Sequence, residues 1–249
     1  MTERKLKVGL IVQARVGSTR LPGKSLMDLA GKPLVGRILE RLTRCKCVDE
    51  LVLAIPETTE NDPLVNIGKE YGATVFRGSE DDLLDRYLQA AIVSGLSIIA
   101  RLPADNATPE PKEIDRIINY HLEENISGFS TNLAEIYSSG YPDGIGAEVF
   151  SLETLMKAIS RNPSAEQREH IHLNFFDYSS SQALNSDECP VKTLECPPEY
   201  KRPDLVLDVN TIEQYYFIKA LYEHLYPTNP NFGIVDTIRW YDTVWSRHA

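Results

Sequence analysis

One short segment, VQARVGSTRLPGK at residues 12–24, concentrates the kinds of side chain that bind phosphate. Cationic and small residues alternate along it: Arg15, Gly17, Ser18, Arg20, Gly23 and Lys24. Arginine grips phosphate oxygens with two parallel N–H bonds, and lysine supplies a mobile point charge. Glycine lets backbone N–H groups approach phosphate closely, and the serine adds a hydroxyl donor. The segment therefore predicts a binding site for a triphosphate.

The spacing of the two glycines argues against an ATPase-type P-loop. Gly23-Lys24-Ser25 resembles the end of that motif, but five residues separate Gly17 from Gly23, where the motif has four. One of the five is Pro22, which has no N–H to donate. The other alternative is a basic surface turn, and three cations directly after a buried strand argue against it.

Alternating strand and helix patterns position this segment. Apolar runs predict buried strands at residues 7–14, 51–55, 73–76, 97–102 and 205–209. Helical spacing predicts helices that begin near residue 33 and cover residues 61–71, 82–94, 111–123, 152–159 and 211–226, with a helical tail within 232–249. Repeated strand–helix units favour an α/β fold, with helices on both faces of a mostly parallel sheet. Such sheets bind ligands at the carboxyl ends of their strands, here the loops after residues 14, 55 and 102.

The second half of the chain is less regular. Short strand-like pieces with turn signals occupy residues 128–149, and residues 185–203 are polar and Pro-rich, which is typical of surface loops. The sequence contains no internal repeat and no clear linker. We therefore expect one domain over residues 1–249, with a small inserted lobe around 128–200 that carries antiparallel strands.

Composition excludes several classes of protein. The chain has 249 residues and a formal net charge of −10, which makes nucleic acid a poor partner. No apolar run approaches the roughly 18–20 residues that span a bilayer, and the first residues lack the features of a signal peptide. The four cysteines are not spaced like a zinc site and are expected to be reduced structural thiols. We expect a cytoplasmic protein with no membrane partner.

Several motifs together resemble the signature of the cytidylyltransferases, which include the 3-deoxy-manno-octulosonate (KDO) and acylneuraminate enzymes. These motifs are Gln13-Ala14-Arg15, STRLPGK at residues 18–24, and GKPL at residues 31–34. Further segments resemble the spore coat polysaccharide biosynthesis protein F branch: SEDDLLDRY at 79–87, YPDG at 141–144, EVFS at 148–151 and REH at 168–170. The resemblance extends over nearly the whole chain, to about residue 225.

This resemblance implies a Rossmann-like sheet of the nucleotide-diphospho-sugar transferase type. It also implies an enzyme, usually a homodimer, that activates sugar acids or similar small anionic acceptors as CMP conjugates. By motif position, Arg15 and Lys24 hold the triphosphate of CTP and Arg20 supports them. Ala14, Gly17 and Ser18 belong to the same nucleotide-binding motif, and Arg86 matches a position near the nucleotide.

Two aspartates are candidates for holding Mg²⁺, which prefers carboxylate and phosphate oxygens. Asp105 fits the family's acidic position after residues 97–102, although Ala104 stands where glycine is commoner; we expect Asp105 to be catalytic. The family's second aspartate is replaced by Asn210, but Asp208 lies two residues earlier on the same face of the predicted strand. The alternatives are that Asp105 forms a turn or helix cap, and that Asn210 only caps the next helix.

Polar residues of the inserted lobe are the candidates for binding the acceptor, because in this family the lobe faces it. They are Tyr141, Asp143, Glu148, Arg168 and His170. Arg168 suits an acceptor carboxylate or phosphate, and His170 suits the orientation of a hydroxyl. A lone histidine is, however, more often structural.

Three functions remain open on the sequence. The first is transfer of CMP from CTP to a sugar acid or related anionic acceptor, with release of pyrophosphate, in the biosynthesis of cell-surface polysaccharide or glycan precursors. The second is transfer to a phosphate- or phosphonate-bearing acceptor, which gives a CDP-type product. The third is a nucleotide-binding homologue without catalysis, supported only by Asn210.

Overall fold

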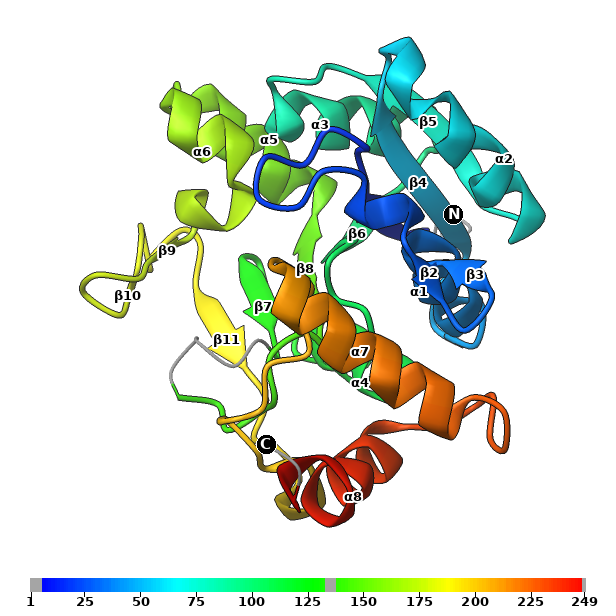
Figure 1. The fold of residues 1–249 in the computed structure, drawn as a ribbon. Helices are drawn as coiled ribbons and strands as arrows, with labels where there is room; N and C mark the ends of the chain where they lie inside the picture. The colour runs from blue at the N-terminus through cyan, green and yellow to red at the C-terminus, as the bar shows by residue number, and fades with distance from the viewer. Residues whose placement is uncertain (1–5, 133–137, 248–249) are drawn as a thin grey trace.

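A seven-stranded sheet forms the centre of the molecule in a computed structural model that describes residues 6–132 and 138–247 (Figure 1). Its strands follow the order β11-β7-β8-β6-β1-β4-β5. In chain order they are β1 (Val8–Gln13), β4 (Glu50–Pro56), β5 (Thr74–Gly78), β6 (Ile98–Pro103), β7 (Phe129–Thr131), β8 (Glu148–Ser151) and β11 (Val191–Thr193). Pairings are parallel except those of β8, which runs antiparallel to both neighbours. This arrangement confirms the predicted fold class.

Helices cover both faces of the sheet. They are α1 (Leu34–Leu42), α2 (Asp62–Glu70), α3 (Leu83–Val93), α4 (Pro111–Glu123), α5 (Leu152–Ser160), α6 (Ala165–Glu169), α7 (Ile212–Leu225) and α8 (Ile234–Thr243). Alternation along β1 separates two cores, because Leu10 and Val12 pack with α1, α4 and α7, whereas Ile11 packs with α3 and α5. Because helices cover both faces of the sheet, a ligand can bind at the carboxyl ends of the strands.

The lobe predicted at residues 128–200 contributes β7, β8 and β11 to the central sheet. It also supplies α5, α6 and a hairpin of β9 (Phe176–Asp177) and β10 (Gln182–Ala183), which projects from the body in Figure 1. A second small antiparallel pair joins β2 (Asp28–Leu29) to β3 (Lys32–Pro33). Residues 133–137 of the predicted lobe, and both ends of the predicted domain, lie outside the described residues.

Two predictions in the second half were wrong. Residues 185–203 are not all loop, because Val191–Thr193 forms the parallel edge strand β11. Residues 205–209 alternate as a strand does, with Leu205, Leu207 and Val209 buried and Val206 exposed, but they make only isolated bridges. One bridge joins Asn106 to Asp208, and this contact places the chain before α7 beside the end of β6.

The start of α7 is firmly held next to this contact. Thr211 and Gln214 form a capping box, and the Gln214 side chain also accepts the N–H of Asn210 at 2.8 Å. Farther along, the hydroxyl of Tyr222 donates to the carbonyl of Ala107 at 2.8 Å. Within the described residues, no helix combines the length and apolar character that a membrane crossing requires.

Candidate active site

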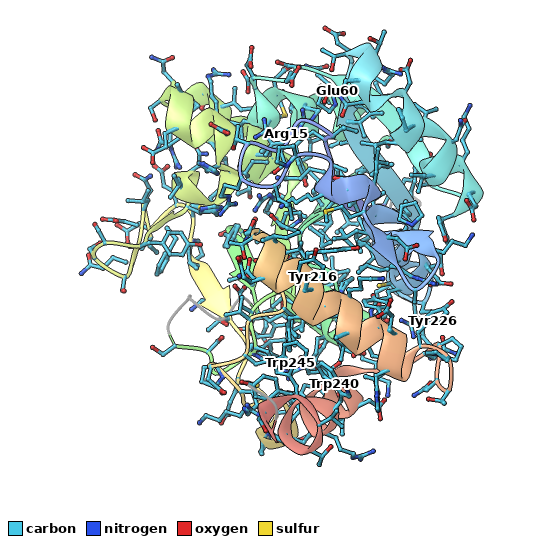
Figure 2. All side chains as sticks on the ribbon, viewed as in Figure 1. Arg15, Glu60, Tyr216, Tyr226, Trp240 and Trp245 are labelled. Atoms are coloured by element: carbon cyan, nitrogen blue, oxygen red, sulfur yellow. The ribbon has the colours of Figure 1, made fainter. Side chains whose placement is uncertain are left out.

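A cleft of about 720 Å³ opens at the carboxyl ends of β1 and β6, where Gln13 pairs with Pro103. Most of the residues predicted from the sequence line it: Ala14, Arg15, Ser18, Arg20, Lys24, Arg86, Asp105, Asp143, Glu148, His170 and Asp208. These residues come from six parts of the chain, so the fold brings together what the sequence keeps apart. Figure 2 labels Arg15 on the loop that follows β1.

The loop after β1 is closed on itself by backbone bonds. The N–H groups of Ser18 and Gly23 both donate to the carbonyl of Val16, at 2.8 and 3.0 Å. Gly23 has φ 73°, a left-handed conformation that favours glycine and begins the short turn containing Lys24. Gly17 is not among the described residues that line the cleft; it faces the carboxylate of Glu60 instead. The predicted contact of the Gly17 backbone with phosphate stays a prediction.

Lys24 is held in the cleft by three oxygen atoms. Its Nζ donates to Asp105 Oδ2 at 3.1 Å, to the carbonyl of Val209 at 2.9 Å and to Asn210 Oδ1 at 3.4 Å. The backbone N–H of Val209 in turn donates to the carbonyl of Asp105 at 2.9 Å. The loop after β1, the end of β6 and the chain before α7 therefore meet at this lysine.

Asp208 lies in the cleft because a glycine makes room for it. Gly144 has φ 87°, and a Cβ at that position would come within 2.5 Å of Asp208 Oδ1. The backbone around Gly144 is paired with the same stretch, since Asp143 N–H donates to Leu205 O at 2.9 Å. The YPDG motif thus permits the close approach that brings Asp208 next to Asp105 and Asn106.

The donors here fit a hard divalent cation only in part. Asp105, Asp208 and Asn210 all line the cleft and offer carboxylate or amide oxygen, which Mg²⁺ prefers. In the described part of the chain, no group of three or more His, Cys, Asp or Glu side chains is arranged to hold a metal. Oxygens of a bound triphosphate would complete the coordination, as is usual for Mg²⁺ at nucleotide sites.

Arg86 is a buried cation at the same cleft. It is 4% exposed, and its Nη1 donates to the carbonyl of Ser79 at 2.7 Å. Its Nε is buried and has no hydrogen-bond partner in the described residues. Burial lowers the pKa of Arg86 to about 10, so the side chain is still charged at neutral pH. A buried donor of this kind is suited to an oxygen atom of a bound ligand.

A buried ion pair forms another part of the lining. Arg101 on β6 donates to Glu148 on β8 at 2.6 Å, and its Nε donates to Gln13 Oε1 at 3.1 Å. Burial alone would lower the pKa of Arg101, but the Glu148 carboxylate outweighs burial and raises it. The sequence pattern missed Arg101 because it occurs inside the apolar run IIARLP, which reads as plain core.

His170 and His172 lie side by side at the cleft, with ring centroids 5.8 Å apart. Tyr178, from the β9–β10 hairpin, meets His172 edge to face at 5.2 Å. Burial lowers the pKa of His172 from 6.5 to about 4. Tyr178 was not predicted, because no spacing in the sequence relates the hairpin to the cleft, and His172 was not among the predicted site residues although it follows His170 by two positions.

We expect His172 to stay neutral in the folded protein until the pH falls to about 4. The unfolded chain takes up a proton near its ordinary pKa of about 6.5, so stability is lost as the pH falls from about 6.5 towards 4. Between pH 7 and pH 5 the wild type should lose up to roughly 2 kcal/mol more unfolding free energy than His172→Gln. Urea unfolding of both proteins measures the difference, and equal losses would contradict the assignment.

The short helix α6 connects two sides of the cleft. Arg168 forms an ion pair with Asp82, which also caps α3 through a bond from Asp85 N–H at 2.9 Å. Arg15 Nη2 lies 3.7 Å from Glu169 Oε1. Arg168 itself is not among the described residues that line the cleft. The guanidinium of Arg168 holds α6 on α3, and the predicted contact of Arg168 with the acceptor stays a prediction.

Tyr141 is also displaced from its predicted role. Its ring is fully buried, and its hydroxyl donates to Glu113 Oε2 at 2.7 Å and accepts from Arg116. Burial, with help from Glu113, raises the pKa of Tyr141. A buried tyrosine hydroxyl needs a polar partner, and Glu113 supplies one within the core beside α4. Tyr141 is therefore a buried side chain that does not line the cleft, which differs from its predicted place at the acceptor site.

Several known proteins are similar to this chain in sequence or in structure. A family model described as Cytidylyltransferase matches residues 10–224. The spore coat polysaccharide biosynthesis protein SpsF of Bacillus subtilis is 33% identical over 217 residues, which is 86% of this chain and 85% of that one. A solved cytidylyltransferase from Leptospira borgpetersenii has a TM-score of 0.85 and 31% identity, and the match covers 97% and 96% of the two chains. The 3-deoxy-manno-octulosonate cytidylyltransferase of Geobacter sulfurreducens is 36% identical over 115 residues, which is 45% of this chain and 44% of that one.

Proposed function

This chain belongs to the cytidylyltransferase family, and we propose that it transfers CMP from CTP to a sugar acid or related anionic acceptor. One observation carries the proposal: Arg15, Arg20 and Lys24 line a single cleft together with Asp105 and Asp208. Three cations suit a triphosphate, and two carboxylates suit its metal ion. The setting in cell-surface polysaccharide or glycan precursor biosynthesis follows from the name of the SpsF relative and is part of the proposal.

In the proposed reaction an acceptor oxygen attacks the α-phosphorus of CTP. A new phosphorus–oxygen bond forms, the bond to the oxygen bridging to the β-phosphorus breaks, and pyrophosphate leaves with that electron pair, while the proton of an acceptor hydroxyl passes to solvent. Arg15, Arg20 and Lys24 neutralise the charge that develops on the leaving group. Mg²⁺ bound there would supply further neutralisation of this charge. Asp105 and Asp208 are the residues that would hold it.

The base and ribose are assigned to the part of the cleft near Arg86. Its buried Nε has no hydrogen-bond partner among the described residues and suits an oxygen atom of the nucleotide, and Ala14 and Ser18 of the loop after β1 line the same cleft. Burial makes such a contact selective, because a ligand that lacked the oxygen would leave the donor unpaired.

The acceptor is assigned to the polar wall formed by Asp143, Glu148, His170 and Tyr178. Arg101 takes the role that the sequence gave to Arg168, because Arg101 lines the cleft and Arg168 does not. A guanidinium held by Glu148 and Gln13 is fixed in direction, which favours binding of the acceptor carboxylate. The carboxylates and hydroxyl around it suit a polyhydroxylated molecule.

Two measurements test this function. In a thermal-shift panel of CTP, UTP, ATP and GTP with Mg²⁺, CTP should give the largest rise in melting temperature. A screen of pyrophosphate release over octulosonic acids, nonulosonic acids and phosphorylated polyols then identifies the acceptor. Turnover with phosphorylated polyols alone would replace the sugar-acid assignment with a CDP-type product. No turnover with any anionic acceptor would favour a non-catalytic homologue.

Assembly as a homodimer is part of the same proposal. The family resemblance supports it, and the projecting β9–β10 hairpin offers an element for contact between copies. Light scattering after size exclusion measures the mass in solution. A mass near 28.1 kDa at all concentrations would contradict the dimer.

A further inference from the structure

The contact of Lys24 with Asp105 points to a second role for this lysine. We propose that its ammonium group is the resident counter-ion of Asp105, and that the triphosphate draws it away, so that a divalent metal binds tightly only together with the nucleotide. The inference rests on the proposed function, since it takes Asp105 as a metal ligand. It adds an order of assembly that the family assignment does not contain.

The contacts of Lys24 are those of a bound cation. Its Nζ has three oxygen acceptors: Asp105 Oδ2 at 3.1 Å, Val209 O at 2.9 Å and Asn210 Oδ1 at 3.4 Å. A lysine ammonium has three N–H donors, so this set uses all of them. The side chain of Lys24 is only 12% exposed and that of Asp105 only 21%. The ammonium thus occupies Asp105 Oδ2, an oxygen of one of the two carboxylates assigned to the metal.

The backbone that carries these oxygens is held in place, whereas the lysine side chain can move. The backbone N–H of Val209 donates to the backbone carbonyl of Asp105 at 2.9 Å. The backbone N–H of Asn210 donates to the side chain of Gln214 at the start of α7. Lys24 has a flexible stem of four carbons and follows Gly23 in a loop. When a ligand arrives, the lysine is therefore the group that changes position.

Because both are positively charged, a metal ion and the Lys24 ammonium group do not bind at this place together. The lysine neutralises Asp105, and a divalent cation that approached the same oxygens would be repelled by the ammonium. The described residues do not assemble three acidic, histidine or cysteine ligands that would offset this repulsion. A triphosphate removes both the repulsion and the shortage of ligands. Its negative charge attracts Lys24, and its oxygens serve as further ligands for the metal.

The test measures Mn²⁺ binding to the full chain, by the enhancement of water proton relaxation, with Mn²⁺ alone. Wild type should bind Mn²⁺ weakly, and Lys24→Met should bind it at least about tenfold more tightly, since the competing charge is gone. Lys24→Arg keeps the charge and should behave as wild type. Arg20→Met is the matched control: it removes a cation from the same loop, and no contact between Arg20 and Asp105 occurs in the described residues. Adding Asp105→Asn to Lys24→Met should abolish the gain.

Several outcomes would overturn the inference. They are tight Mn²⁺ binding by wild type alone, an equal gain in Arg20→Met, or a gain that survives Asp105→Asn. Lys24→Gln repeats the test with a polar side chain if the methionine variant does not fold, and absence of a gain in the folded variants also overturns it. Failure of the proposed function is seen separately, as absence of a thermal shift by CTP with Mg²⁺ in wild type.

Discussion

Asp105→Asn is expected to lower CTP-dependent pyrophosphate release by at least about 10³-fold, the equivalent of several kcal/mol of transition-state stabilisation. The substitution keeps the size of the side chain and removes its charge. It weakens the hold on the metal, which would neutralise the charge that develops as pyrophosphate leaves. The rate is measured with the acceptor that the screen identifies.

The control for this variant is Asp187→Asn, which removes an identical charge from an exposed position outside the cleft. It should keep the wild-type rate. Unfolding of Asp105→Asn should differ little from wild type, because Lys24 keeps the carbonyl of Val209 and the amide of Asn210 as partners. Near-normal turnover by Asp105→Asn would end the assignment of Asp105 as a metal ligand and catalytic residue.

The elements around the cleft could be predicted where the residues of a single segment are sufficient to identify its structure. The apolar runs that became β1, β4 and β6 are buried on both faces, so their composition alone marks them as central strands. β11 has only three residues, Val191–Thr193, and such a short segment carries no readable period. The stretch at 205–209 shows the opposite case. Its alternating pattern predicts correctly which side chains are buried, but a buried alternating segment need not pair with a neighbouring strand.

The residues of the candidate site show the same contrast: those that are close in sequence could be predicted, and those that only the fold brings together could not. The cations of the loop after β1 were visible because they lie within ten residues of one another. Arg101 and Glu148 meet only because β8 turns antiparallel beside β6, and no local signal announces that pairing. Tyr141 shows the opposite error, because a tyrosine in a turn motif looks exposed until Glu113 and Arg116 are placed around its hydroxyl.

The pair Arg101–Glu148 leads to the second large effect. Replacing Glu148 with alanine leaves the Arg101 guanidinium buried without its carboxylate, and we expect a loss of roughly 3–5 kcal/mol in unfolding free energy. The double variant Arg101→Met, Glu148→Leu removes both charges and fills the same space. It should recover most of that loss, because a buried ion pair is seldom better for stability than well-packed apolar side chains. Urea unfolding of the wild type, the single variant and the double variant gives the comparison.

In the double variant we expect catalytic activity to be lost although most of the stability is recovered. Its apolar pair cannot bind an acceptor carboxylate, so acceptor-dependent pyrophosphate release should fall by at least about 10²-fold. The thermal shift produced by CTP with Mg²⁺ should persist, because Lys24, Arg15 and Asp105 are untouched. If the double variant were as unstable as Glu148→Ala, the ion pair would be a structural element. If it were stable and fully active, the acceptor would bind elsewhere. A stable, CTP-binding and inactive double variant would show that the two charges are retained in the core for the acceptor.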